Sequence, residues 1–118
     1  MFEKYFENLG FSINEAKVFK ALFTLWTKPA SIIAKYIWME RTSVYKILQR
    51  LVNENLIFET YKWWIKHFFI PNIDILKEYT NKKIKKFKEI EKDYENVKQE
   101  FSYLSNKKDK NLPKITLF

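Results

Sequence analysis

The stretch Arg41-Thr42-Ser43-Val44-Tyr45-Lys46-Ile47-Leu48-Gln49-Arg50-Leu51 has the apolar spacing of one helix face. Apolar residues at i, i+3, i+4 and i+7 predict an amphipathic helix that packs on a core: Val44, Ile47, Leu48 and Leu51. The other side carries hydrogen-bond donors and no acid: Thr42, Ser43, Tyr45, Lys46, Gln49 and Arg50. Such a helix suits the major groove of DNA, and a solvated basic helix is the alternative.

Two elements that precede this stretch read as helices. Apolar residues repeat at helical spacing from Phe2 to Leu9, and Gly10 stands where a left-handed residue would end that helix. Ser12-Ile13-Asn14-Glu15 has the pattern of a capping box, in which Ser12 and Glu15 bond each other's backbone amides. We therefore expect a second helix from about Ile13 to Trp26, with a wide apolar face.

A third, short helix is expected directly before the opening stretch. Lys28-Pro29-Ala30 interrupts the helical pattern, because proline cannot continue a helix interior. Ser31 is then the expected N-cap of a helix from Ile32 to Ile37. The turn Trp38-Met39-Glu40 lacks the glycine often found there, but two helices joined so tightly still predict a helix-turn-helix.

After Asn53-Glu54-Asn55 the apolar period changes from 3.6 to 2. Residues 56–61 and 66–70 are rich in aromatic and branched side chains and predict two strands, joined by residues 62–65. Three helices followed by a β-hairpin form a winged helix. The expected fold class is mainly α, a winged helix-turn-helix over residues 1–72.

A long charged helix is expected after Pro71. From residue 73 to about residue 105, apolar positions alternate in steps of three and four, which predicts a coiled-coil helix that pairs with a second copy. Thr80 and Lys83 weaken the middle of the seam. Residues 106–118 are expected to form a linker and a strand-like tail. The predicted dimer residues are Leu76, Phe87, Ile90, Tyr94, Val97, Phe101 and Leu104.

Composition favours an anionic partner and gives little support to catalysis. The 118 residues carry a net charge of +8, which points to nucleic acid or a membrane surface. No apolar run is long enough to span a membrane, so no membrane partner is expected. The absence of cysteine and of an N-terminal apolar segment predicts a cytoplasmic protein.

Common enzyme sites depend on glycine-rich loops or on clusters of histidine and cysteine, and this chain has few of these residues. It has one glycine, Gly10, and one histidine, His67, so a glycine-rich phosphate loop and the usual metal clusters have no basis. The carboxylates are scattered among lysines at helical spacing, as on a solvated surface. We expect no enzyme, no catalytic or metal site and no cofactor, and no small-molecule ligand can be inferred.

The chain resembles the TrmB family of transcriptional regulators. The resemblance rests on residues 9–19 (LGFSINEAKVF), residues 31–35 (SIIAK) and above all on Arg41-Thr42-Ser43-Val44-Tyr45, and it extends to Leu76. It implies a winged-helix regulator whose coiled-coil helix leads to an effector domain. Three features depart from the family pattern. Asn55 replaces a glycine, Lys62-Trp63-Trp64-Ile65 replaces a wing of glycine and basic residues, and the effector domain is absent.

The expected partners are double-stranded DNA and a second copy of the chain. Arg50 and Gln49 can make bidentate contacts to guanine and adenine, respectively, whereas Thr42 and Ser43 suit a phosphate at a helix N-terminus. A salt bridge is the alternative for Arg41. The full set of expected DNA contacts is Arg41, Thr42, Ser43, Tyr45, Lys46, Gln49, Arg50, Lys35, Lys62 and Lys66.

The tryptophan pair at the expected hairpin tip leaves other functions open. Trp63 and Trp64 could bury against the core, wedge at a groove edge or form a patch for another protein. The alternative function is therefore a winged helix that docks on a protein through this hairpin. A basic coiled coil that meets membranes or RNA only incidentally is a further alternative.

Overall fold

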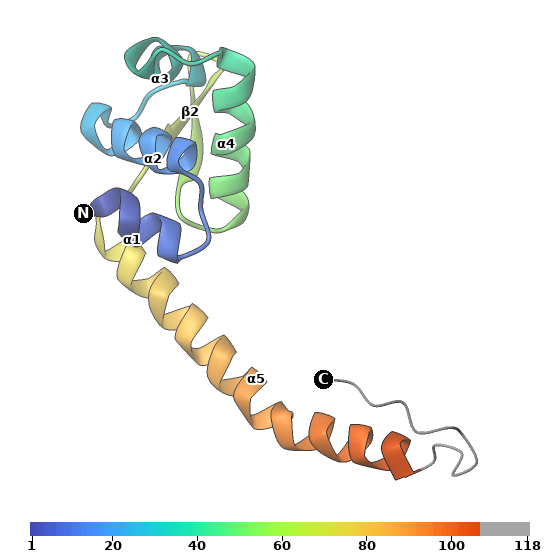
Figure 1. Ribbon diagram of the computed structural model, residues 1–118. Helices are drawn as coiled ribbons and strands as arrows, with labels where there is room; N and C mark the ends of the chain where they lie inside the picture. The colour runs from blue at the N-terminus through green and yellow to red at the C-terminus, as the bar shows by residue number, and fades with distance from the viewer. Residues whose placement is uncertain (107–118) are drawn as a thin grey trace. The chain divides into compact units, whose positions relative to one another are not determined.

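The computed structural model describes residues 1–106 and divides the chain into two compact units, Met1–Asn81 and Lys82–Phe118. The predicted mainly helical fold with a hairpin and a long C-terminal helix is confirmed (Figure 1). The elements of the described chain are α1 (Phe2–Asn8), α2 (Ile13–Leu25), α3 (Ala30–Ile37), α4 (Arg41–Asn53), β1 (Phe58–Lys62), β2 (Ile65–Phe69) and α5 (Asp74–Asn106).

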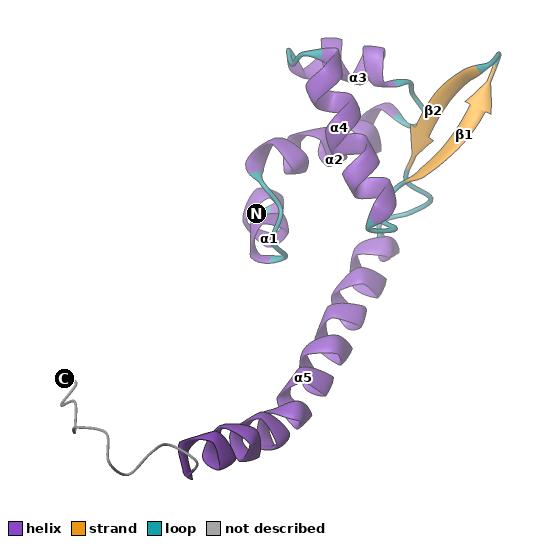
Figure 2. Ribbon diagram, turned by 90° about the vertical axis from the view of Figure 1, so that its right-hand side faces the viewer, coloured by secondary structure: helices purple, strands orange, loops and turns teal. Residues whose placement is uncertain are grey.

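The first unit is built around one hydrophobic core. Helices α1 to α4, the segment after α4 and strand β2 all contribute to it, and Figure 2 shows the hairpin extending from this helical body. Three phenylalanine rings at one end of the core stack in sequence, Phe2 on Phe6 and Phe6 on Phe11. The largest side chains that are fully buried are Phe6, Phe19, Phe68, Leu22, Ile33, Leu48, Leu51, Leu56, Ile57, Val18 and Val44.

The helix boundaries follow the local sequence signals in two cases and differ in a third. Gly10 has a φ of 97° after α1, and the capping box between Ser12 and Glu15 is complete, as predicted. The expected N-cap of α3 was wrong. The helix begins at Ala30 with Pro29 at the N-cap and no side-chain cap, and the fixed φ of proline suits the extended conformation of an N-cap residue (φ −78°, ψ 163°).

The hairpin is tighter than predicted. Strands β1 and β2 pair antiparallel from Phe58–Phe69 to Lys62–Ile65, so only two residues form the turn instead of four. Residues 56 and 57, expected in the first strand, lie fully buried before it. Phe68 also exchanges two backbone hydrogen bonds with Lys28 (3.1 and 2.8 Å), which form an isolated antiparallel bridge on β2.

The first turns of α5 belong to the core of the first unit. Leu76 and Tyr79 are each 8% exposed, and the Thr80 hydroxyl lies 2.6 Å from the Tyr5 hydroxyl of α1. These turns therefore belong to the first compact unit, which extends to Asn81. The expected linker and strand-like tail lie outside the described residues, apart from Asn106 at the end of α5.

The described residues contain neither a candidate membrane span nor a candidate metal site. No helix in that part of the chain is both long and apolar enough to cross a membrane. No group of three or more His, Cys, Asp and Glu residues within the same range could hold a metal ion.

Candidate nucleic-acid interface

Helix α4 is fastened to the core along one side. Val44, Leu48 and Leu51 are fully buried, and Ile47 packs against them while partly exposed. Burial of side chains of this size stabilises the fold by about 1.5–3 kcal/mol each, which is enough to fix the rotation of the helix about its own axis. The face that bears Thr42, Tyr45 and the residues one turn on is consequently turned away from the core.

The N-terminal turn of α4 presents basic and hydroxyl groups. Arg41 and Thr42 are exposed and Ser43 is half-buried, while Glu40 at the N-cap makes no side-chain cap. A surface depression of about 710 Å³ lies between α3 and α4, and Lys35 and Arg41 both line it. The two cations are thus placed at the joint of the helix-turn-helix.

The middle of α4 is connected to the hairpin through two side chains. The Tyr45 ring packs edge-on against Phe68, with 6.3 Å between the ring centroids, and remains 42% exposed. Lys66 of β2 donates a hydrogen bond to the Tyr45 hydroxyl (3.3 Å) and lies 5.7 Å from the centre of its ring. The hairpin and α4 therefore form one continuous surface.

An acidic residue, Glu59 of β1, lies at the edge of this surface. Its carboxylate pairs with the Lys66 ammonium at 3.2 Å and accepts a hydrogen bond from the Gln49 amide at 3.4 Å. The hydrogen bond to Tyr45, and after it the contact with Glu59, raises the pKa of Lys66 above its usual 10.5. Lys66 thus keeps its charge, but part of that charge is neutralised by Glu59.

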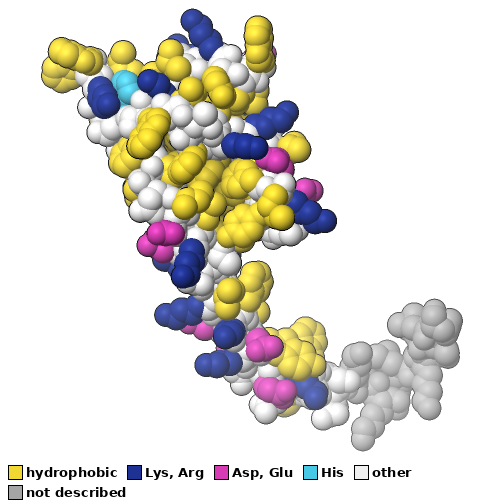
Figure 3. Space-filling model, turned by 90° about the vertical axis from the view of Figure 1, so that its left-hand side faces the viewer, with side chains coloured by type: hydrophobic (Ala, Val, Ile, Leu, Met, Phe, Trp, Pro, Cys, Tyr) yellow, Lys and Arg dark blue, Asp and Glu magenta, His cyan; other side chains and the backbone are white. Residues whose placement is uncertain are grey.

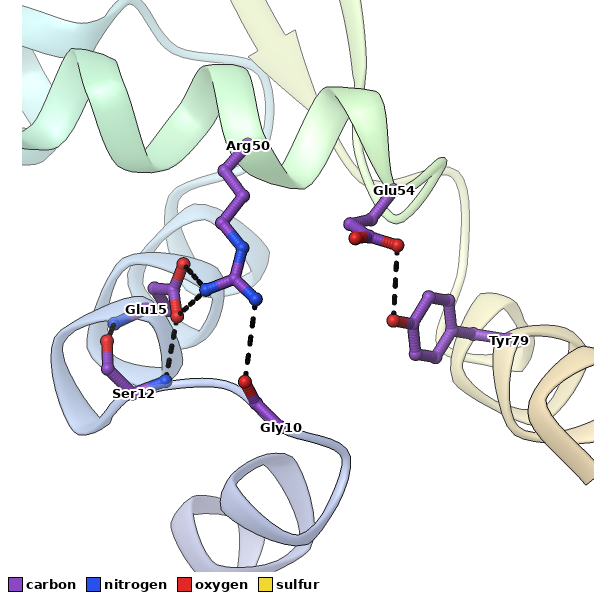
Figure 4. A network of polar contacts seen from close by, with 6 residues as sticks. All are labelled: Gly10, Ser12, Glu15, Arg50, Glu54 and Tyr79. Carbon is purple, nitrogen blue, oxygen red and sulfur yellow. Dashed lines mark hydrogen bonds and ion pairs between the residues drawn. The ribbon is translucent and has the colours of Figure 1, made fainter. Parts of the chain in front are cut away.

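Arg50 lies apart from the other predicted contacts. Its guanidinium pairs with Glu15 of α2 and also reaches the Gly10 carbonyl oxygen at 3.4 Å (Figure 4). It also covers the Phe11 ring, 4.8 Å from the ring centroid. Glu15 is only 5% exposed, so this carboxylate needs its partner. Arg50 therefore holds α4 against α2.

A second polar contact joins α4 to the start of α5. The Tyr79 hydroxyl donates a hydrogen bond to the Glu54 carboxylate at 3.2 Å (Figure 4). Burial, and next the nearby Glu54 charge, raises the pKa of Tyr79 to about 12. The phenol remains neutral over the physiological range and acts as a structural donor.

The predicted residues fall into groups in the structure. Tyr45, Lys46 and Gln49 share the outer face of α4, and the hairpin brings Lys66 beside Tyr45. Arg50 is turned to α2, Lys62 is exposed near the hairpin tip, and Leu76 is in the core. The sequence did not predict the ion pairs of Glu15 with Arg50 and of Glu59 with Lys66. Nothing in the local sequence around either glutamate indicates a partner in a distant element.

Comparison with known proteins gives one match. A family model described as sugar-specific transcriptional regulator TrmB covers residues 6–69, which is more than half of the chain. The matched region spans the core, the helix-turn-helix and both strands of the hairpin. No curated protein matches the chain.

Proposed function

We propose that the chain, which belongs to the TrmB family of transcriptional regulators, binds specific DNA sequences as a homodimer with α4 in the major groove. The family consists of DNA-binding regulators, and enzymatic activity is not its role. The observation that carries the finer proposal is the outward face of α4. Its side chains are polar and non-acidic, and its inner face is fully buried.

Base contacts and phosphate contacts would come from different residues of this surface. Gln49 has an amide suited to an adenine edge, and its only partner in the described chain is the weak 3.4 Å contact with Glu59. Arg41, Lys46 and Lys35 are exposed cations and would position the helix on the phosphates. We do not assign Arg50 to base contacts, because its guanidinium is engaged by Glu15.

Support for the homodimer comes from α5. Beyond Asn81 its apolar seam is exposed in a single chain, and hydrophobic side chains are visible along the helix in Figure 3. A hollow of about 400 Å³ on this helix is lined by Tyr94, Val97 and Phe101, and a side chain from a facing helix could fill it. The exposed seam residues are Phe87, Ile90, Tyr94, Val97, Phe101 and Leu104.

A duplex bound in this way would be contacted at two half-sites. Two α4 helices on one face of B-DNA lie about 34 Å apart, so the bound sequence should be a pseudo-palindrome with half-sites about one helical turn apart. Selection of bound sequences from a random duplex pool tests this directly. Recovery of no common motif would contradict sequence-specific binding.

Fluorescence anisotropy with the selected duplex separates the roles within α4. Gln49→Ala should relax the preference at one base position and cost about 1–3 kcal/mol there. Lys46→Ala should weaken binding to all duplexes alike and reduce the salt slope by about 1. Docking on a protein through the exposed hairpin tip, the alternative, predicts instead that DNA affinity is absent or depends little on salt.

A further inference from the structure

Every tryptophan of the chain has a left-handed backbone conformation. The chain contains four, Trp26, Trp38, Trp63 and Trp64, with φ values of 68°, 58°, 53° and 66°. Only a few per cent of non-glycine residues have positive φ, so four such residues by chance have odds on the order of 1 in 100,000. Among residues 1–106 the other positive φ values belong to Gly10 and Asn55, the two residue types that favour this region.

Each tryptophan also stands at a position where the backbone conformation favours glycine. Trp38 follows α3 in the αL conformation, and the Met39 amide bonds the Ala34 carbonyl oxygen at 3.0 Å, as in a Schellman cap. Trp63 and Trp64 form the two-residue turn between paired strands, and two positive φ values there define a type I′ turn. Trp26 ends α2 at ψ −145°, at the edge of a region essentially restricted to glycine.

The indole side chains bring no compensation for this backbone. They are 79%, 94%, 89% and 95% exposed in chain order, although tryptophan is on average a highly buried residue. No indole N–H donates a hydrogen bond within the part of the chain that the structure describes. Hydrophobic side chains project from the molecule beside the single histidine, His67 of the hairpin (Figure 3).

We infer that positions 26, 38, 63 and 64 are glycine in the protein as the cell makes it, because one codon at these positions is translated as glycine. The codon UGA is read as a stop, as tryptophan or as glycine in different genetic codes, so one change of meaning explains all four positions together. A binding function for the indoles explains the exposure of the hairpin pair, but it leaves Trp26 and Trp38 without a reason for their backbone conformation.

Glycine at these positions would also change the wing of the proposed regulator. A hairpin tip without side chains lets its backbone come closer to a phosphate, while Lys62 and Lys66 flank the turn. This consequence rests on the proposed function. The assignment of glycine to the four positions does not rest on the proposed function, because it follows from backbone geometry and can be tested without DNA.

Peptide mass spectrometry of the protein purified from its own cells tests the assignment. Trypsin should release residues 21–35, 36–41 and 63–66 as separate peptides. We expect each of the first two to be lighter by one tryptophan-to-glycine difference and the third by two. The purified protein should also lack tryptophan fluorescence. A peptide that retains an indole at any of the four positions would overturn the inference.

A recombinant comparison gives an independent measurement of the backbone argument. The variant with all four tryptophans changed to glycine should melt at least about 10 °C above the tryptophan chain. The matched variant with alanine at the same four positions removes the indoles but keeps the Cβ atoms, so it should not show this gain. An equal rise with alanine, or a loss of stability with glycine, would count against glycine at these positions.

Discussion

The guanidinium of Arg50 pairs with the carboxylate of Glu15, so α4 is joined to the capping box of α2. The Glu15 carboxylate therefore makes two contacts. It pairs with Arg50, and it accepts a hydrogen bond from the Ser12 backbone amide at 2.7 Å. The pair helps to fix how α4 meets α2, and it engages the Arg50 guanidinium although that side chain is partly exposed. Its role is one of stability, which gives the first prediction.

Arg50→Ala should destabilise the fold without changing sequence preference. Loss of the partner leaves Glu15 buried and unpaired, and breaking a fully buried pair costs about 3–5 kcal/mol. Because the Arg50 side chain is 47% exposed, we expect about 2 kcal/mol, measured by urea unfolding. The matched control is Lys46→Ala, which should change stability by less than about 0.5 kcal/mol. An altered motif in duplex selection with Arg50→Ala would show that this arginine contacts bases.

Glu59→Gln should strengthen DNA binding. The change removes a negative charge from the edge of the proposed interface and releases the Lys66 ammonium for a phosphate. One added phosphate contact steepens the salt dependence of affinity by about 0.9 in log–log slope, which anisotropy titrations would measure. Glu3→Gln is the matched control, because Glu3 pairs with Lys20 at 3.3 Å on α1 and α2. Equal effects of both variants would mean that net charge alone is responsible.

Tyr79 should make the first unit lose stability at high pH. Its folded pKa of about 12 is raised above the usual value of 10.0, chiefly by burial, so folding favours the neutral phenol. This contribution is complete below about pH 10 and is lost as the pH rises through about 12. The contribution of Tyr79 to the free energy of unfolding is on the order of 2 kcal/mol. Unfolding of the chain and of Tyr79→Phe should therefore differ in pH dependence across this window, and parallel curves would contradict the assignment.

Charges placed in the α5 seam should separate the proposed dimer. Phe87→Asp with Val97→Asp puts two carboxylates where apolar side chains would meet, so light scattering should give the mass of a single chain. DNA affinity should fall by about 100-fold or more, because the second half-site no longer binds in tandem. Asn96→Asp with Gln99→Asp adds the same charge at exposed positions off the seam and should leave the dimer intact. If the seam variant and this control variant have the same mass in light scattering, the seam is misassigned.

Much of the fold could be predicted because local signals agreed with it. The buried face of α4 follows from the spacing of Val44, Leu48 and Leu51, and the start of α2 follows from Ser12 and Glu15. The hairpin turn could not be placed, since tryptophan gives no indication of positive φ. A turn of two residues was therefore expected to be four residues long.

Long-range contacts account for what the sequence pattern missed in the candidate site. Arg50 has the chemistry of a base contact, and its engagement by Glu15 depends on how α4 crosses α2. Leu76 continues the heptad pattern but is covered by the first unit. Helical periodicity shows which residues share a face; it does not show what that face meets.

The Tyr79–Glu54 hydrogen bond has a mechanical consequence. Because it fastens the first turns of α5 to the end of α4, those turns cannot rotate about their axis unless α4 turns with them or this bond breaks. Torque applied at the base of α5 would therefore turn α4 as well, and the strength of this phenol contact would help to set how much torque the connection can carry.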